Sequence, residues 1–289
     1  MLIDHMSFGD GIPRINCYSL TDFNTFDFCP FRFYVTHHLG KKYEIEEGNL
    51  NMALGSVLDE SIKKFHKAKA YGQPSSYLIN IIRAAVLDIK EKAAKTAGKP
   101  SYYSGIIKFI DEDLIKKANE IFINYYEKRD GKINQSLGEV KFCEWLLEIG
   151  GEKFKLWGWP DTYEMGEDGI AEIVDYKFRE DIERGKENMD MDLMPKIYAL
   201  LAAKDLKEKG YNKARFKVRF WQDSLEEDFF EEFDLDLVSG SEYLFKQKLE
   251  KILGNKSLKF CEKGFCSACN NKGREQFILE LEKLGILVD

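Results

Sequence analysis

Hydrophobic side chains recur at helical spacing through the first half of the chain. Between residues 50 and 70 the apolar positions fall on one face of a helix, at Leu54, Val57, Leu58, Ile62 and Phe65. The same spacing of three and four predicts further helices over residues 76–95, 105–128, 190–208, 240–253 and 272–285. Long amphipathic helices of this kind need a partner surface, so we expect them to pack on one another or on a sheet.

From Gly138 onward the pattern changes toward the period of two that strands require. Segments 156–163 and 170–178 are rich in aromatic and β-branched residues, and they flank the turn-type cluster Met165–Gly169. We therefore predict a β-hairpin. A further strand is predicted over residues 216–221, where apolar and basic side chains alternate.

Three charged side chains lie on the predicted hairpin. Asp161 is near its first strand, and Asp175 and Lys177 share one face of the second because they are two residues apart. Two carboxylates 4 Å apart repel by roughly 4 kcal/mol at an effective dielectric constant of 20, so such a pair favours a divalent cation between them. Oxygen ligands favour Mg²⁺ or Mn²⁺ over Zn²⁺. The alternative is a surface hairpin with ordinary exposed charges.

A lysine beside two carboxylates and a cation has two roles in catalysis. The ammonium can orient or activate a water molecule, and it can stabilise negative charge on a phosphate. These are the groups that metal-assisted phosphodiester hydrolysis needs.

Six cysteines are present, and three of them form the cluster Cys261-x4-Cys266-x2-Cys269. In an intracellular chain this spacing indicates metal ligands rather than disulfides, and Cys29 is the best candidate for a fourth ligand. Joining Cys29 to the cluster closes a loop of more than 200 residues, which restricts the unfolded chain by about 5 kcal/mol. Thiolates suit iron–sulfur or zinc; the remaining alternative is a buried apolar Cys29 and free C-terminal thiols. The other two are predicted to be packed core thiols, Cys17 and Cys143.

Composition places the chain among globular proteins without a membrane span. It has 289 residues, of which 44% are hydrophobic and 32% are charged. No run of eighteen apolar residues and no secretory leader is apparent. We expect a cytoplasmic, intracellular protein, or one in the host cytoplasm if a virus encodes it.

The net charge of −7 argues mildly against a nucleic-acid partner, because DNA-binding proteins usually carry a basic surface. The charge is unevenly distributed, however. Lysines are dense between residues 41 and 69, whereas residues 226–236 are acidic. Lys217 and Arg219 share one face of a predicted strand, where we expect them to meet phosphate.

The order Pro160-Asp161, a thirteen-residue gap and Asp175-Tyr176-Lys177 resembles the PD-(D/E)xK nuclease superfamily. The flanking sequences Gly158–Thr162 and Ile173–Lys177 look like its RecB-like, Cas4-like branch. Residues Ser19–Phe33 match the segment that opens the domain in that branch. One cysteine before the nuclease core and three after it also resemble the iron–sulfur exonucleases of this group.

The resemblance implies an α/β fold: a restriction-endonuclease-like central mixed β-sheet flanked by helices, with a helical elaboration and an N-/C-terminal iron–sulfur cluster region. We expect one nuclease domain over residues 1–289. Within it, residues 19–135 would be mainly helical, 136–225 would form the catalytic sheet core, and 226–289 would hold the C-terminal helices and the cysteine cluster.

The resemblance also assigns roles to residues. It implies that Asp161, Asp175 and Lys177 are catalytic, and that the two aspartates and the carbonyl of Tyr176 bind Mg²⁺ or Mn²⁺. A [4Fe–4S] cluster would be bound by four cysteines, with a structural Zn²⁺ as the alternative: Cys29, Cys261, Cys266 and Cys269.

Two positions depart from the family pattern. Asp59 stands where a metal-binding histidine is usual after Gly55; it is either a third oxygen ligand or a surface aspartate paired with Lys63. The helix after the active-site strands keeps Tyr198, a substrate-positioning residue or a core tyrosine, but has Met194 in place of a glutamine. On the same helix as Asp59, His66 is predicted to lie at the surface.

Three functional hypotheses follow. The first is a Mg²⁺- or Mn²⁺-dependent deoxyribonuclease, an exonuclease on single-stranded DNA or DNA ends. It would act in DNA repair, recombination or CRISPR adaptation, with protein partners from those pathways. The second, motivated by Asp59 and Met194, is a DNA-binding accessory protein on a nuclease scaffold with weak or no catalysis. The third is a structural zinc protein without a nucleic-acid role.

Overall fold

The computed structural model describes residues 13–42, 48–97, 101–128, 133–138, 140–178, 193–221, 229–255, 257–258, 260–261 and 266–288. The chain divides into two compact units. Unit 1 is formed by Met1–Glu46, Phe142–Gly158 and Val238–Asp289, and unit 2 by Glu47–Lys141 and Trp159–Leu237. Each unit therefore combines segments that are far apart in the sequence. Within the described residues, no helix is both long enough and apolar enough to cross a bilayer.

Unit 2 contains a four-stranded mixed sheet in the order β4-β5-β6-β7. Its strands are β4 (Thr162–Met165), β5 (Ala171–Lys177), β6 (Lys213–Phe220) and β7 (Phe229–Asp234). β5 pairs antiparallel with β4 and parallel with β6, while β6 and β7 are antiparallel. The parallel pair is joined through a connection that contains α9 (Met194–Glu208), as parallel strands require.

The predicted hairpin is confirmed, with β4 and β5 in antiparallel register. Its turn closes through a hydrogen bond from the Gly166 N–H to the carbonyl of Ile170, and Gly169 adopts a φ of 79°, a conformation that L side chains rarely adopt. The prediction of one continuous strand over residues 156–163 is wrong. β3 (Glu152–Gly158) ends before Pro160, which has no N–H to donate to a ladder, and β4 begins at Thr162.

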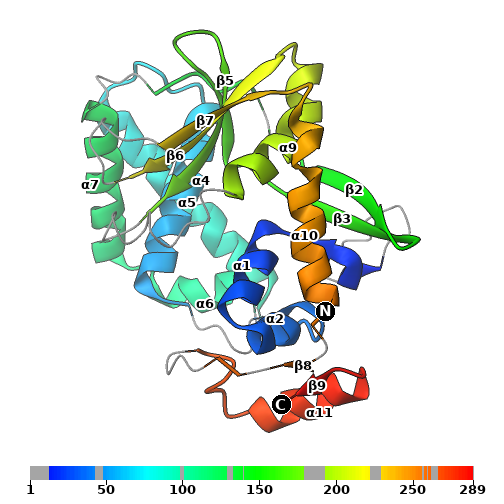
Figure 1. Cartoon of the computed structure of the whole chain (residues 1–289). Helices are drawn as coiled ribbons and strands as arrows, with labels where there is room; N and C mark the ends of the chain where they lie inside the picture. The colour runs from blue at the N-terminus through cyan, green and yellow to red at the C-terminus, as the bar shows by residue number, and fades with distance from the viewer. Residues whose placement is uncertain are drawn as a thin grey trace. The chain divides into compact units, whose positions relative to one another are not determined.

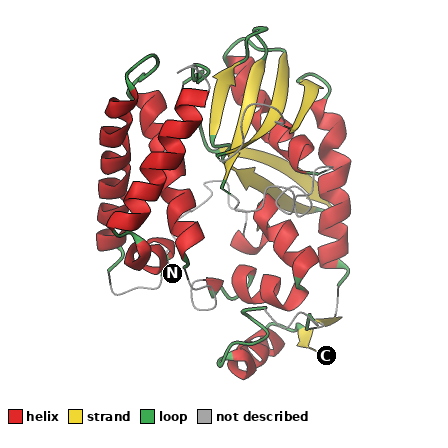
Figure 2. Ribbon diagram, turned by 90° about the vertical axis from the view of Figure 1, so that its left-hand side faces the viewer, coloured by secondary structure: helices red, strands yellow, loops and turns green. Residues whose placement is uncertain are grey.

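Helices cover the sheet face that carries Val174 and Tyr176. Figure 1 shows three of them packed beside one another, and Figure 2 shows them running side by side: α4 (Leu50–Lys67), α5 (Ser75–Lys95) and α7 (Glu112–Lys128). Their apolar faces form one buried cluster with Val174, Tyr176, Phe178 and Trp221. Burying an apolar side chain contributes about 1.5–3 kcal/mol, so this cluster holds the bundle to the sheet.

The helix predicted over residues 105–128 is interrupted in the structure. α6 (Tyr102–Ile106) and a 3₁₀ turn, η2 (Ile107–Phe109), precede α7. The interruption follows from Asp111, whose Oδ1 accepts a hydrogen bond from the backbone N–H of Leu114 at 2.8 Å. A side chain that satisfies a free N–H in this way starts a new helix.

Unit 1 contains a three-stranded sheet in the order β1-β3-β2, and its core is aromatic. Tyr18, Phe23 and Phe33 are buried and pack ring against ring, with Phe245 at the edge of Phe23. The remaining elements of this unit are β1 (Cys17–Tyr18), η1 (Arg14–Asn16), α1 (Leu20–Phe28), α2 (Pro30–His37), β2 (Cys143–Ile149), η3 (Val238–Ser241), α10 (Glu242–Leu253), β8 (Ser257–Leu258), α11 (Arg274–Lys283) and β9 (Leu287–Val288).

The fold is thus a mixed α/β arrangement with two mixed sheets rather than one central sheet. The capping box predicted at Ser19 is confirmed, since Ser19 and Asp22 exchange hydrogen bonds at the start of α1. Cys17 and Cys143 are buried, as predicted.

Candidate active site

The backbone of the hairpin brings the predicted catalytic residues together in unit 2. Asp161 lies just before β4, and its Oδ2 accepts a hydrogen bond of 2.8 Å from the backbone N–H of Tyr176. Tyr176 stands between Asp175 and Lys177 on β5. The bond therefore ties the loop aspartate to the strand that carries the other two groups.

Asp175 and Lys177 form an ion pair on one face of β5. Lys177 Nζ lies 2.8 Å from both carboxylate oxygens of Asp175. Asp175 is buried, whereas the Lys177 side chain remains 29% exposed. Burial opposes the charged ammonium, but the negative charge of Asp175 outweighs it and holds the pKa of Lys177 well above its usual range. Lys177 is thus a stable cation that solvent or a ligand can reach.

Asp59, on α4, belongs to the same electrostatic group. Burial raises the pKa of Asp59 to about 8, and the negative charge of Asp161 adds to this effect. The charges of Lys177 and Lys63 oppose it, and that of Asp175 reinforces it. A carboxyl group that is coupled to both hairpin aspartates is not an ordinary surface aspartate.

Tyr198, on α9, approaches the same ion pair from the next element. Its ring stacks on Phe216 of β6 with the centroids 5.3 Å apart. Burial, followed by the charge of Asp175, raises the pKa of Tyr198 above its usual range. Met194, which replaces the family glutamine, is buried on the same helix and offers no hydrogen-bond donor and only a weak thioether acceptor.

The residues fit a divalent cation in charge and in donor type. Three carboxylates interact in a partly buried place: burial raises the pKa of Asp59 to about 8, and the negative charges of Asp161 and Asp175 add to this effect. Oxygen donors of this kind are those that Mg²⁺ and Mn²⁺ prefer. In the part of the chain that the structure describes, however, the carboxylates do not converge as closely as the cysteine thiols do.

The four predicted cysteine ligands do meet, all within unit 1. Their Sγ atoms lie within 4.8 Å of one another, with 3.6 Å from Cys29 to Cys269 and 3.7 Å from Cys261 to Cys269. Cys29 is placed by the junction of two helices: it ends α1, begins α2, and accepts a hydrogen bond from the N–H of Arg32. Four thiolates are a ligand set that would suit either a structural Zn²⁺ ion or a [4Fe–4S] cluster.

A buried ionic network behind the hairpin was missed by the sequence patterns. Arg219 was expected to meet phosphate, but it is 2% exposed and pairs with Glu164 and Glu172. Lys217 also contacts Glu172, at 2.8 Å. His66 was expected at the surface, but its side chain is 7% exposed and lies 3.6 Å from Glu164. Both expectations were wrong, because burial of a charge depends on partners from other strands.

Glu164 gives the network a pH dependence. Burial alone would raise its pKa, but Arg219 and then His66 and Tyr176 outweigh burial and lower the pKa to about 2. A carboxyl whose folded pKa is lowered stabilises the fold above its unfolded pKa of about 4.5 and loses that contribution as the pH falls towards 2. The contribution is on the order of 3 kcal/mol.

We therefore expect Glu164→Gln to flatten the dependence of unfolding free energy on pH between pH 4.5 and pH 3. Urea unfolding of the parent and the variant at several pH values measures this. Glu120→Gln, which changes an exposed glutamate on α7, should keep the parent's dependence. An unchanged slope in Glu164→Gln would show that Glu164 is not held ionised by the network.

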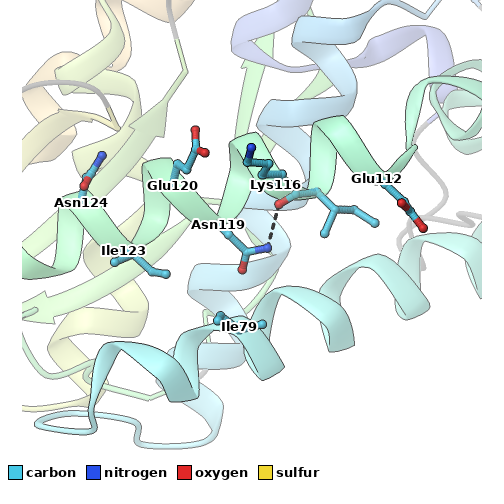
Figure 3. A pocket seen from close by; sticks show the side chains of 8 residues that line it. Ile79, Glu112, Lys116, Asn119, Glu120, Ile123 and Asn124 are labelled. Atoms are coloured by element: carbon cyan, nitrogen blue, oxygen red, sulfur yellow. Dashed lines mark hydrogen bonds between the residues drawn. The ribbon is translucent and has the colours of Figure 1, made fainter.

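A surface groove on unit 2 lies apart from these carboxylates. It has a volume of about 420 Å³ and runs between α5 and α7, lined mainly by Ile79, Ile115, Ile123 and Asn119. Figure 3 shows Asn119 donating a hydrogen bond to the carbonyl of Ile115 at 2.8 Å. None of the predicted site residues lines it, so we do not assign it to the active site.

Comparison with family models matches residues 18–274 to the PD-(D/E)XK nuclease superfamily. The chain belongs to this superfamily. The matched range includes the hairpin with Asp161, Asp175 and Lys177, as well as the four clustered cysteines. Superfamily membership supports a phosphodiester hydrolase, with DNA as the substrate that it suggests.

Other comparisons add little to the superfamily assignment. No curated protein matches the chain. Among solved structures, the crystal structure of SSO0001 is similar, with 11% sequence identity, a TM-score of 0.30, and coverage of 84% of this chain and 80% of that chain. That similarity is too low to support an argument about fold or function.

Proposed function

We propose that this protein is a Mg²⁺- or Mn²⁺-dependent deoxyribonuclease that hydrolyses phosphodiester bonds, acting as an exonuclease on single-stranded DNA or DNA ends. The observation that carries the proposal is the geometry of the hairpin. Two hydrogen bonds of 2.8 Å join Asp161, the backbone of β5, Asp175 and Lys177 into one group. Membership of a nuclease superfamily supports hydrolysis of phosphodiester bonds as the reaction of this group.

Each residue has a role that its environment supports. Asp161 and Asp175 hold the cation, with Asp59 as a third carboxylate and the Tyr176 carbonyl as a neutral oxygen ligand. The bound cation would polarise the phosphate and stabilise the charge that builds on it. Lys177 is partly exposed and donates a hydrogen bond of 2.8 Å to Asp175. It is suited to orient water or to bind a phosphate oxygen.

Tyr198 is the candidate for positioning the substrate. Burial and then the charge of Asp175 raise its pKa, and its ring stacks on Phe216 of β6, the strand that pairs with β5. The raised pKa keeps it a neutral donor at physiological pH. From α9 it can hold the Asp175 carboxylate and the incoming phosphate in one arrangement.

We further propose that the protein belongs to the RecB-like, Cas4-like branch and acts in the cytoplasm in DNA repair, recombination or CRISPR adaptation with protein partners. The four-cysteine site supports that branch. It would hold a [4Fe–4S] cluster, with a structural Zn²⁺ ion as the alternative. Iron and zinc analysis, with an absorbance spectrum of the freshly purified protein, decides between the two.

Lys177→Ala tests the assigned role of the lysine. We expect DNA cleavage to fall at least about a hundredfold, because the transition state loses a preorganised cationic donor. Binding of Mn²⁺, measured by calorimetry, should persist because Asp161 and Asp175 remain. Lys213→Ala, at the far end of the parallel strand β6, is the matched control and should cleave like the parent.

Two results would contradict this role. If Lys177→Ala cleaved DNA at the parent's rate, Lys177 would not be catalytic. If the parent bound DNA but left it intact with every divalent ion, the protein would be a DNA-binding accessory protein, the alternative that Asp59 and Met194 favour.

A further inference from the structure

The side chain of Tyr176 points away from the candidate active site into a buried ionic network. Its hydroxyl donates a hydrogen bond of 2.8 Å to Glu164 Oε1 and accepts one of 3.3 Å from Arg219 Nη1. Arg219 Nη1 also pairs with Glu164 Oε2. All three residues are at most 2% exposed. The residue whose N–H binds Asp161 is therefore fixed at its other end by a buried salt bridge.

The network extends across three neighbouring strands. Arg219 Nη2 donates to Glu172 Oε2 at 2.8 Å, which brings in the second buried carboxylate. Glu172 also receives Lys217 Nζ at 2.8 Å and Asn134 Nδ2 at 3.1 Å. Glu164 is on β4, Glu172 is on β5 and Arg219 is on β6, so these contacts fix the strands against one another.

A chain of polar groups links the same network to α4. The hydroxyl of Tyr71 accepts a hydrogen bond from the N–H of Ser136 and lies 2.9 Å from His66 Nδ1. On the other side of the imidazole ring, His66 Nε2 lies 3.6 Å from Glu164 Oε1. His66 and Asp59 are seven residues apart on α4, so they lie on one face of that helix.

Stability alone does not account for these buried charges. Desolvating them is costly, and replacing a buried ion pair with packed apolar side chains is often neutral or stabilising. Their placement suggests another use, because β5, which carries Asp175 and Lys177, and α4, which carries Asp59, are both contacted by the network. Groups behind a metal site commonly orient its ligands in this way.

We propose that Tyr176 and Glu164 are positioning residues of the nuclease site. The Tyr176 hydroxyl, held by Glu164 and Arg219, sets the position of the β5 backbone that binds Asp161 and carries Asp175 and Lys177. Through His66, Glu164 also sets where α4 presents Asp59. This inference rests on the proposed function for its reaction, but the positioning itself concerns cation binding and can be measured without DNA.

Tyr176→Phe tests the proposal with little change in shape, because the ring can keep its stacking on Trp221 at 4.8 Å. We expect the dissociation constant for Mn²⁺, measured by calorimetry on the full chain, to rise about tenfold. With a short DNA oligonucleotide at saturating Mn²⁺, kcat should also fall about tenfold and KM should stay unchanged. Glu164→Gln should shift both quantities in the same direction.

Tyr126→Phe is the matched control. It removes another buried tyrosine hydroxyl from unit 2, one that donates a hydrogen bond of 2.8 Å to the carbonyl of Gln73. The control should lose a similar amount of thermal stability while its Mn²⁺ affinity and kcat stay at the parent values. A loss of Mn²⁺ affinity in Tyr176→Phe but not in Tyr126→Phe separates positioning from a general weakening of the fold.

The outcomes distinguish this inference from the proposed function. If the parent binds Mn²⁺ without cutting DNA, and Tyr176→Phe weakens that binding, the nuclease proposal fails and the positioning role stands. If the parent cuts DNA and Tyr176→Phe matches Tyr126→Phe in Mn²⁺ affinity, kcat and stability, the positioning role is overturned. Should Tyr176→Phe be unfolded, Glu164→Gln gives the same comparison, and parent-like Mn²⁺ affinity there overturns the proposal.

Discussion

Replacing Asp175 with asparagine is expected to reduce metal-dependent DNA cleavage on the order of a thousandfold. The substitution keeps the volume of the side chain but removes the negative charge that pairs with Lys177 and that would hold the cation. Initial rates on end-labelled DNA with saturating Mg²⁺ measure the loss. Circular dichroism and thermal unfolding show whether the variant stays folded.

Asp168→Asn is the matched control for this prediction. Asp168 lies in the turn of the same hairpin, where it is exposed and pairs with Arg215 rather than with the site. Its variant should cleave DNA like the parent. If Asp175→Asn were as active as Asp168→Asn, the carboxylate of Asp175 would not take part in the reaction.

Replacing Cys266 with alanine is expected to remove the metal site that we propose for unit 1 and to destabilise that unit. The four thiols lie within 4.8 Å of one another, so losing one leaves three ligands. Cys29 and Cys261 are then no longer joined across the chain, and the unfolded state regains about 5 kcal/mol of conformational freedom in the loop-closure model. Elemental analysis and thermal unfolding of the purified variant measure both effects.

Cys143→Ala separates loss of the centre from loss of a buried thiol. Cys143 is buried on β2 of unit 1 but is not one of the four clustered cysteines. Its variant should keep the parent's metal content and lose only a small part of the stability. A Cys266→Ala protein with full metal content and the parent's melting temperature would contradict the assignment of the four thiols as a metal site.

Local patterns in the sequence were enough to predict the hairpin. It follows from two apolar runs and a turn that includes Gly169, and these are neighbours in the sequence. The meeting of the four cysteines needed more, because Cys29 is remote from the other three. It was predicted because three clustered thiols lack a fourth ligand and because the family pattern has one cysteine before the nuclease core, and the structure confirms their approach.

Features that depend on distant partners could not be predicted in the same way. Glu164 and Arg219 are 55 residues apart, and each lies in an alternating strand where a charged side chain is normally read as solvent-facing. Their burial follows from helices packing on that face of the sheet. The electrostatic coupling of Asp59 to the hairpin likewise needs α4 to lie along β5, which its amphipathic pattern does not specify.

The division into two mixed sheets was also outside the reach of local patterns. Pro160 marks a break between β3 and β4, but it does not say that the strands on either side join different sheets. Sheet membership is decided by long-range pairing, such as that of β3 with the short N-terminal strand β1.

The most direct test of the account is a cleavage assay on end-labelled single-stranded and duplex DNA with Mg²⁺, Mn²⁺ or EDTA. We predict that the parent shortens labelled DNA with either cation, that EDTA stops the reaction, and that Asp175→Asn leaves the DNA intact. DNA that stays intact with both cations, or cleavage that continues in EDTA, would contradict the claim that Asp161, Asp175 and Lys177 form a metal-dependent nuclease site.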